Sequence, residues 1–165
     1  MYEVIVIILI SLSLFIFGSF SGYIVHRILH SNRLKHLAKD HNVHHALYPI
    51  DNFESTSYRG AGSSRSTLVF IPIITVAMLL LCVPIWFLFK EWWVFFFIII
   101  EGILIGWAND YLHYAFHIKN HWLNNYIFFK KLKDIHYLHH KYPKTNHGIL
   151  WFGPDKLCGT YRNLL

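Results

Sequence analysis

The chain has 165 residues, of which 55% are hydrophobic and 15% charged, and its formal net charge is +6. This length fits one domain, and the apolar excess excludes an ordinary soluble domain. The basic residues form no run of five or more, so the charge indicates membrane topology rather than a nucleic-acid partner. Cys82 and Cys158 lie far apart and form no CxxC, which argues against a disulfide framework or a thiolate metal site.

Three apolar stretches predict transmembrane helices at about residues 4–25, 67–89 and 92–109. At about 1.5 Å per residue, the first two are long enough for a hydrocarbon core of about 30 Å. Only Lys90 and Glu91 separate the second from the third, which predicts a helical hairpin. The first stretch lacks a basic n-region and is long for a signal peptide, so we expect it to be an uncleaved helix.

The basic residues predict the orientation of these helices. Of the 15 Lys and Arg, six lie in residues 26–66, eight in residues 110–165, and only Lys90 lies on the other side. The positive-inside rule therefore predicts that both regions are cytoplasmic, at a bacterial inner membrane or an endoplasmic reticulum membrane. All 13 histidines lie in the same two regions and none in a predicted span. The predicted fold is a single all-α domain over residues 1–165, an integral membrane helical bundle with about three transmembrane helices and a cytoplasmic histidine-rich helical cap.

The histidines follow a repeated pattern, HxxxH and then HxxHH, once after the first span and once after the third. About 0.08 HxxHH matches are expected by chance in a chain of this composition, and two occur. On a helix, positions i, i+3 and i+4 share one face, so each box points its imidazoles in one direction. Neutral imidazole suits iron, zinc and copper, and ten ligands are more than one metal needs, so we predict two metals. The ten candidate ligands are His26, His30, His41, His44, His45, His113, His117, His136, His139 and His140.

Other polar residues are candidates for supporting roles. Asp110 lies three residues before a box histidine and is the best candidate to orient an imidazole N–H, and Asn146 is the next. For both, a helix cap or a surface position is the alternative. His147 follows the last box and is either an extra ligand or a supporting residue. His36 and His121 fall outside the boxes, and we expect both at the surface or the membrane interface.

Two further features leave alternatives open. Glu101 is the only Asp, Glu, Lys, Arg or His residue in the predicted spans. It is either functional, as ionisable groups in a membrane often are, or a neutral acid bonded between helices. Residues 48–66 could cover the histidine site or bind a polar headgroup, and a plain juxtamembrane loop is the other interpretation.

The second half of the chain carries a longer series of motifs around its histidines. It reads Asp110-Tyr-Leu-His113-Tyr114 with His117, then Leu132-Lys133, His136-x-x-His139-His140, Asn146-x-Gly148, Asp155 and Gly159-Thr160. This series resembles the fatty acid hydroxylase superfamily, which includes sterol desaturases, sphingolipid fatty-acid hydroxylases and relatives of carotene hydroxylase. The resemblance covers about residues 26–161. The chain departs from many members in having three predicted spans, an HxxxH first box where HxxxxH is common, and no His-Pro-Gly-Gly motif of a fused cytochrome b5.

The resemblance implies a membrane-bound di-iron oxidoreductase that uses O2 to hydroxylate or desaturate a lipid, such as a fatty acyl chain, a sterol or a carotenoid. It implies two iron ions held by the ten box histidines, with zinc able to substitute in purified protein. The expected partners are a membrane lipid substrate and a separate electron donor of the ferredoxin or cytochrome b5 type, with no nucleic acid.

Three alternatives belong to other classes. A histidine-rich membrane protein that binds or transports metal without oxygenase activity should carry ligands along the spans, where only Glu101 qualifies. A bis-histidine heme protein needs paired histidines within facing spans. A structural zinc module needs fewer ligands and usually cysteine.

Overall fold

A computed structural model describes residues 2–31, 35–59 and 69–163 of the protein. The described residues are almost entirely helical, with one isolated β-bridge between Ser55 and Ile118. The predicted all-α class is therefore confirmed. The elements are α1 (Tyr2–Leu29), α2 (Lys35–Leu47), η1 (Ile50–Asn52), α3 (Phe70–Phe89), α4 (Trp92–Phe116), η2 (Trp122–Asn125), α5 (Ile127–Lys141) and α6 (Gly153–Leu157).

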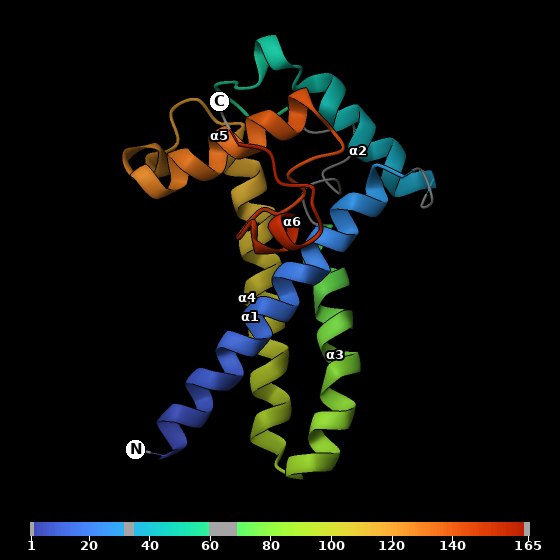
Figure 1. Ribbon diagram of the computed structural model, residues 1–165, viewed down its shortest axis with the longest axis vertical. Helices are drawn as coiled ribbons and strands as arrows, with labels where there is room; N and C mark the ends of the chain where they lie inside the picture. Colours follow the sequence, from blue (N-terminus) through green and yellow to red (C-terminus); the bar gives the residue numbers. More distant parts are fainter. Residues whose placement is uncertain (1, 32–34, 60–68, 164–165) are drawn as a thin grey trace.

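Helices α1, α3 and α4 form an elongated stem, in which α3 and α4 run side by side and α1 crosses them (Figure 1). Each has a segment long and apolar enough to cross a membrane, namely Val4–Leu29, Phe70–Phe87 and Trp92–Phe116. The three predicted spans are confirmed as candidate spans, although residues 67–68 at the expected start of the second lie outside the described part. The predicted hairpin is also confirmed, because Lys90 takes a left-handed conformation (φ 55°) and its N–H donates to the Trp86 carbonyl.

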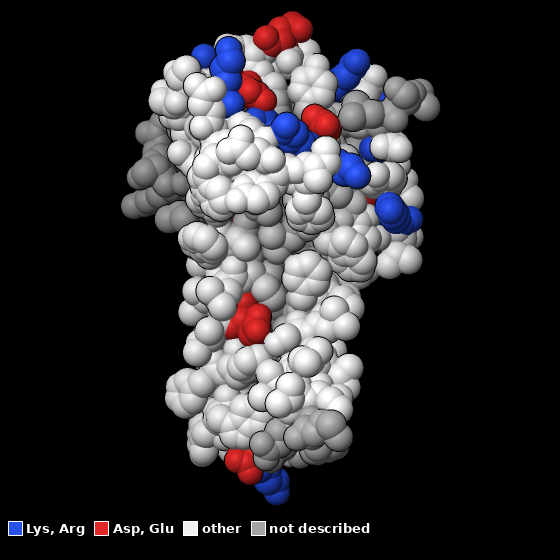
Figure 2. All heavy atoms as spheres, turned by 90° about the vertical axis from the view of Figure 1, so that its left-hand side faces the viewer, with Lys and Arg blue, Asp and Glu red and all other residues white. Residues whose placement is uncertain are grey.

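Charged side chains gather at the two ends of the molecule. Figure 2 shows Lys, Arg, Asp and Glu atoms on the head, formed by α2, α5, α6 and their connecting segments, and at the opposite tip of the stem. Acidic atoms interrupt the apolar stem part way along. The described spans place Glu101 there, and its Oε1 accepts a hydrogen bond from Ser11 Oγ at 3.1 Å. This bond joins α1 to α4, in agreement with the interpretation of Glu101 as a residue bonded between helices.

Two of the stem helices are longer than the apolar runs that predict them. α1 continues to Leu29 and α4 to Phe116, because no proline or glycine follows the apolar run in either segment. His26 and His113 consequently lie inside candidate spans. The expectation that every histidine follows a span is therefore wrong for these two, and a continuous helix carries each of them out of the apolar stem.

Glycine lets the stem helices approach closely. A Cβ on Gly106 of α4 would lie 2.7 Å from the Cα of Ile71 in α3, and a Cβ on Gly18 of α1 would lie 2.7 Å from the side chain of Ile105. Both glycines belong to GxxxG patterns, Gly18–Gly22 and Gly102–Gly106, of the kind that bring membrane helices into backbone contact. The stem is thereby fixed tightly enough to hold the ends of α1 and α4 beside each other.

The segment after α2 is fastened to the end of α4. Ser55 N–H donates to the His117 carbonyl at 2.9 Å, and Lys119 N–H donates to the Ser55 carbonyl at 3.0 Å. These bonds form the short parallel bridge between the two halves of the head. They bring residues 53–55 directly beside the second HxxxH box.

Candidate metal centre

Four helices bring the ten predicted ligands together in the head. His26 lies in the last turn of α1 and His113 in the last turn of α4, and His30 and His117 follow just beyond the ends of these helices. The two HxxHH boxes lie in α2 and α5, as predicted. The side chains form two groups in each of which the candidate ligand atoms lie within 4.8 Å of one another. The first histidine group is His26, His30, His41, His45 and His139, and the second histidine group is His44, His113, His117, His136 and His140.

The two groups exchange one residue between the halves of the chain. The outer histidines of each HxxHH box, four residues apart on one helix face, join the HxxxH box of their own half. The middle histidine joins the opposite half, so that His44 lies in the second group and His139 in the first. The groups adjoin, since the rings of His45 and His140 stack with centroids 4.1 Å apart. Each half of the chain therefore contributes to both groups.

Backbone carbonyls orient two imidazoles of the first group. His26 Nδ1 lies 2.7 Å from the His147 carbonyl oxygen, and His139 Nδ1 lies 2.7 Å from that of Thr145. A carbonyl oxygen can only accept, so each Nδ1 carries the proton. The Nε2 atoms then present lone pairs to the group, the tautomer that metal binding through Nε2 requires.

The second group is oriented in the same way by the segment after α2. His140 Nδ1 donates to the Tyr48 carbonyl at 2.9 Å, and His117 Nδ1 donates to the Phe53 carbonyl at 2.9 Å. The carbonyls of His147, Thr145, Tyr48 and Phe53 thus orient the imidazoles, a role that was expected of the Asp110 and Asn146 side chains. They have no signature in the sequence, because every residue carries a carbonyl.

Burial keeps the imidazoles neutral. It lowers the pKa of His30 to about 4, with nearby His147 and His113 adding to the effect. Burial also lowers the pKa of His136 and of His44 well below the usual value, and neighbouring histidines lower both further. Only a neutral imidazole has a lone pair for a metal, so both groups present ligands in the form that binds metal at neutral pH.

The unpaired nitrogen atoms fit a pair of metal ions. The Nε2 atoms of His26, His44, His113 and His140 are buried without a hydrogen-bond partner in the described structure. Buried polar atoms are rarely left in this state unless an ion or water meets them. The groups contain imidazole and no thiolate or carboxylate, a donor set that suits iron, zinc or copper. Two histidine clusters suited to a di-metal site are therefore present.

The two residues proposed to orient imidazoles bind backbone groups instead. The Asp110 carboxylate accepts the N–H groups of Val69, Phe70 and Ile71 at 2.9–3.1 Å, so it caps the start of α3. The Asn146 amide bonds the backbone of Arg162 in both directions and the Ile135 carbonyl. Each therefore fixes the position of a segment, and the helix-cap alternative is correct for Asp110.

The remaining histidines differ in their placement. His147 is buried but belongs to neither group, although its ring centroid lies 5.4 Å from that of His139. It acts here through its carbonyl, and its role as an extra ligand stays a prediction. His121 lies apart from both groups. Its Nε2 lies 3.1 Å from Tyr111 Oη, and its Nδ1 accepts the Leu123 N–H. The side chain of His36 lies outside the described part of the structure.

A fully buried tyrosine covers the second group. The ring of Tyr48 stacks on that of His117 with centroids 4.1 Å apart, and its hydroxyl accepts the Arg59 N–H. Of the alternatives for residues 48–66, the described part up to Arg59 therefore supports a cover over the site. Residues 60–66 lie outside the described part.

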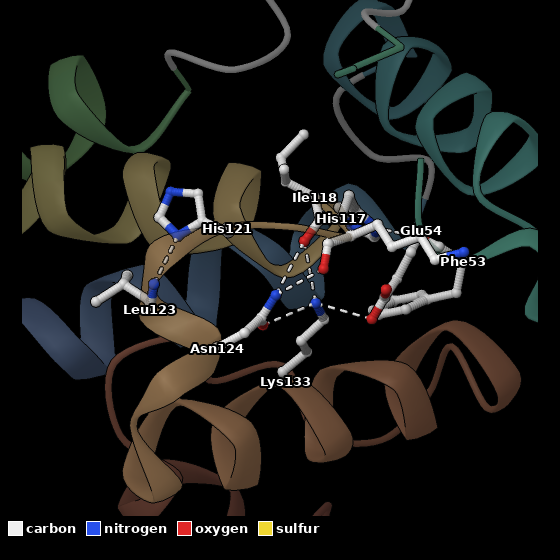
Figure 3. A network of polar contacts seen from close by, with 9 residues as sticks. Phe53, Glu54, His117, Ile118, His121, Leu123, Asn124 and Lys133 are labelled. Atoms are coloured by element: carbon white, nitrogen blue, oxygen red, sulfur yellow. Dashed lines mark hydrogen bonds and ion pairs between the residues drawn. The ribbon is translucent and has the colours of Figure 1, made fainter. Parts of the chain in front are cut away.

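A buried lysine holds this cover in place (Figure 3). Lys133 Nζ donates to the Ile118 carbonyl at 3.2 Å and to Asn124 Oδ1 at 3.1 Å, and it lies 2.8 Å from Glu54 Oε1. Three acceptors use all three protons of the ammonium group. Because Glu54 directly follows Phe53, whose carbonyl orients His117, this network stabilises the position of a ligand of the second group.

Asp155 performs the matching role for the first group. Its carboxylate accepts the His147 N–H at 2.8 Å and the Gly148 N–H at 2.7 Å, and it lies 2.8 Å from Thr160 Oγ1. The loop that carries the Thr145 and His147 carbonyls is thereby held against α1 and α5. The series Asn-x-Gly and Asp-xxx-Gly-Thr in the sequence thus marks a support for the ligands.

The fold and the site together define a class of protein, an all-helical membrane protein with a paired polyhistidine centre at one end of its spans. Comparison with known families agrees with this class, since the family described as "Fatty acid hydroxylase" matches residues 11–160. The chain belongs to the fatty acid hydroxylase family. No curated protein and no solved structure matches it.

Proposed function

We propose that this protein is a membrane-bound di-iron oxidoreductase that uses O2 to hydroxylate or desaturate a lipid. The observation that carries this proposal is the pair of adjoining five-histidine groups at the end of an apolar stem, in each of which the candidate ligand atoms lie within 4.8 Å of one another. Two irons, when bound there, would activate dioxygen for the cleavage of an unactivated C–H bond.

The protein's own residues supply geometry and a dry environment. Four backbone carbonyls fix the imidazole tautomers, and Tyr48 covers the second group from outside. Burial of the ligands keeps water from the reacting groups. The position of the groups at one end of the spans lets a lipid keep its tail among the apolar helices while one of its carbon atoms reaches the site.

The overall reaction needs an electron donor. Hydroxylation places one oxygen atom of O2 in the lipid and reduces the other to water with two electrons and two protons. Desaturation removes two hydrogens, and with them two electrons, from the lipid. Together with two electrons from a donor and two protons, these reduce both oxygen atoms of O2 to water. We propose a separate ferredoxin or cytochrome b5 type of protein as the source, and the cytoplasmic face as the side on which the site lies.

Product analysis with labelled oxygen tests the proposed function. The iron-loaded chain in membranes should convert a lipid to a hydroxylated product that contains 18O from 18O2, or to a product with one more double bond. His140→Ala removes a ligand of the second group and should abolish the product, whereas His121→Ala, outside both groups, should retain it. A wild-type chain that binds two metals but leaves every lipid of its membrane unchanged would favour the alternative of a metal-binding protein without oxygenase activity.

A further inference from the structure

A cavity of about 730 Å³ lies beside the carboxyl end of α1. Its wall includes His30 of the first histidine group and His147, whose carbonyl orients His26. The same cavity is lined by Tyr23, Arg27 and Lys144. It therefore connects the molecular surface to the edge of the candidate metal centre.

The described lining of this cavity carries positive charge and no carboxylate. Arg27 and Lys144 are both exposed, and none of the described residues that line the cavity is Asp or Glu. Among the described residues neither side chain forms an ion pair with a carboxylate. The Arg27 guanidinium is positioned by a hydrogen bond from Nη1 to Tyr23 Oη at 3.0 Å, which leaves its other N–H groups for a ligand. Two cations of this kind recognise an oxyanion, a carboxylate or a phosphate.

A second cavity lies in the apolar stem, toward the amino end of α1 from the first, where Phe17 of its wall precedes Phe20 of the first cavity by three residues. It has a volume of about 490 Å³ and lies between α1 and α3, with Ile10, Phe17 and Leu81 among its lining residues. Ile10 and Phe17 of this groove and Ile24 of the first cavity are spaced by seven residues, so they lie on one face of α1. The basic cavity and the apolar groove thus follow one another along the same helix face.

This succession matches the structure of a lipid. Arg27 stands where the apolar run of α1 ends, at the level expected for headgroups. The apolar side chains of Phe20 and Ile24 in the first cavity lie between it and the groove, whose nearest lining residue on α1 is Phe17. A small soluble anion would use only the cations, and an apolar transmembrane helix would use only the groove. The occupant that uses both parts is an acidic lipid of the surrounding membrane.

We propose that this face of α1 binds an acidic membrane lipid, with the oxyanion of its headgroup on Arg27 and Lys144 and one acyl chain in the groove between α1 and α3. The proposal rests on the proposed function in one respect, because it names the class of lipid that is brought to the histidine centre through the wall at His30. Binding itself requires no turnover.

Photochemical labelling tests the proposal without catalysis. The full chain, loaded with zinc, is placed in phosphatidylcholine nanodiscs with a trace of phosphatidic acid that carries a diazirine near the acyl carbonyl. The control probe is phosphatidylcholine with the same diazirine chain. Labelling by the acidic probe should exceed that by the zwitterionic probe about tenfold, the effect of charge-assisted pairing, and should map to the carboxyl half of α1.

Matched variants identify the groups responsible. Arg27→Gln combined with Lys144→Gln should lose the preference for the acidic probe, Arg27→Lys should retain most of it, and Lys131→Gln, on the exposed face of α5, should leave it unchanged. Equal labelling of the wild type by both probes, or an unaltered preference in the double variant, would overturn the proposal. Competition by millimolar inorganic phosphate would also overturn it, because the site would then bind a free anion.

The outcomes separate this proposal from the proposed function. If the acidic probe labels the chain selectively but the chain never oxidises lipid, the lipid-binding site is supported and the oxidoreductase function is rejected. If the chain oxidises lipid equally well without Arg27 and Lys144, and shows no labelling preference, the function is supported and the lipid-binding site is rejected.

Discussion

At the scale of single residues, the exchange of His44 and His139 between the two histidine groups determines how the site responds to mutation. Each of these residues comes from the middle of an HxxHH box and lies among ligands from the other half of the chain. The remaining four members of each group come from one half only. Loss of one middle histidine therefore removes a ligand from the group that the opposite half builds.

Replacement of the middle histidine of an HxxHH box should abolish metal binding in one histidine group while the other group still binds its metal. His139→Ala takes one of five imidazoles from the first group, and His44→Ala takes one from the second, so each variant should bind about one metal per chain where the wild type binds about two. Metal analysis of purified protein at limiting metal measures this. His121→Ala, which leaves both groups intact, serves as the control. Full retention of both metals in both variants would show that these residues are not ligands.

Tyr48 should matter for its ring more than for its hydroxyl. Tyr48→Ala removes a fully buried ring that stacks on His117 and should lower the free energy of unfolding by roughly 3–5 kcal/mol, as other large-to-small changes do. Tyr48→Phe keeps the ring and should cost about 1 kcal/mol, the loss of the bond from the Arg59 N–H. Thermal unfolding in detergent measures both. Similar losses in the two variants would contradict the cover that we assign to the ring.

The sequence predicts the side-chain part of the site but not its supports. Metal binding restricts the residue type, so the repeated boxes identify the ten histidines that the structure brings together in two groups. The carbonyls of Tyr48 and Thr145 could not be predicted, because a backbone acceptor has no residue preference. The role of Asp110 was open for a different reason, since the helix that it caps begins about 40 positions earlier in the chain.

At the scale of elements, the ends of α1 and α4 position the site because the stem beneath them packs through small residues. The apolar runs predict three spans, but they do not predict how far each helix continues beyond the membrane, which depends on the absence of helix breakers. That continuation places His26 and His113 on rigid helices. Their separation in space therefore follows from the packing of α1, α3 and α4.

Gly106→Leu tests this dependence of the site on the stem. A side chain there would meet the backbone of Ile71, so we expect α3 and α4 to separate and the free energy of unfolding to fall by about 1–3 kcal/mol or more. Metal content should fall with it, because the end of α4 moves. The control is Ile100→Leu, at an exposed position of the same helix. Unchanged stability and metal content in Gly106→Leu would show that the close approach is not required.

At the scale of the whole molecule, the charge distribution and the three candidate spans imply that the head lies on one side of a membrane and the α3–α4 turn on the other. Cys158 is exposed in the head, and Lys90 lies in the turn. In a Cys82→Ser background, a membrane-impermeant maleimide should label Cys158 only from the cytoplasmic side. After Cys158→Ser is added, Lys90→Cys should be labelled only from the opposite side. Labelling of both positions from one side would contradict the predicted topology.

The central claim, that the two histidine groups hold two irons, is tested most directly by counting metal in the purified full-length chain. Iron and heme analysis after anaerobic loading with ferrous iron should give about two irons per chain and no heme, because each group of neutral imidazoles accommodates one ion. One iron per chain, one heme, or no iron in a folded chain would contradict the account.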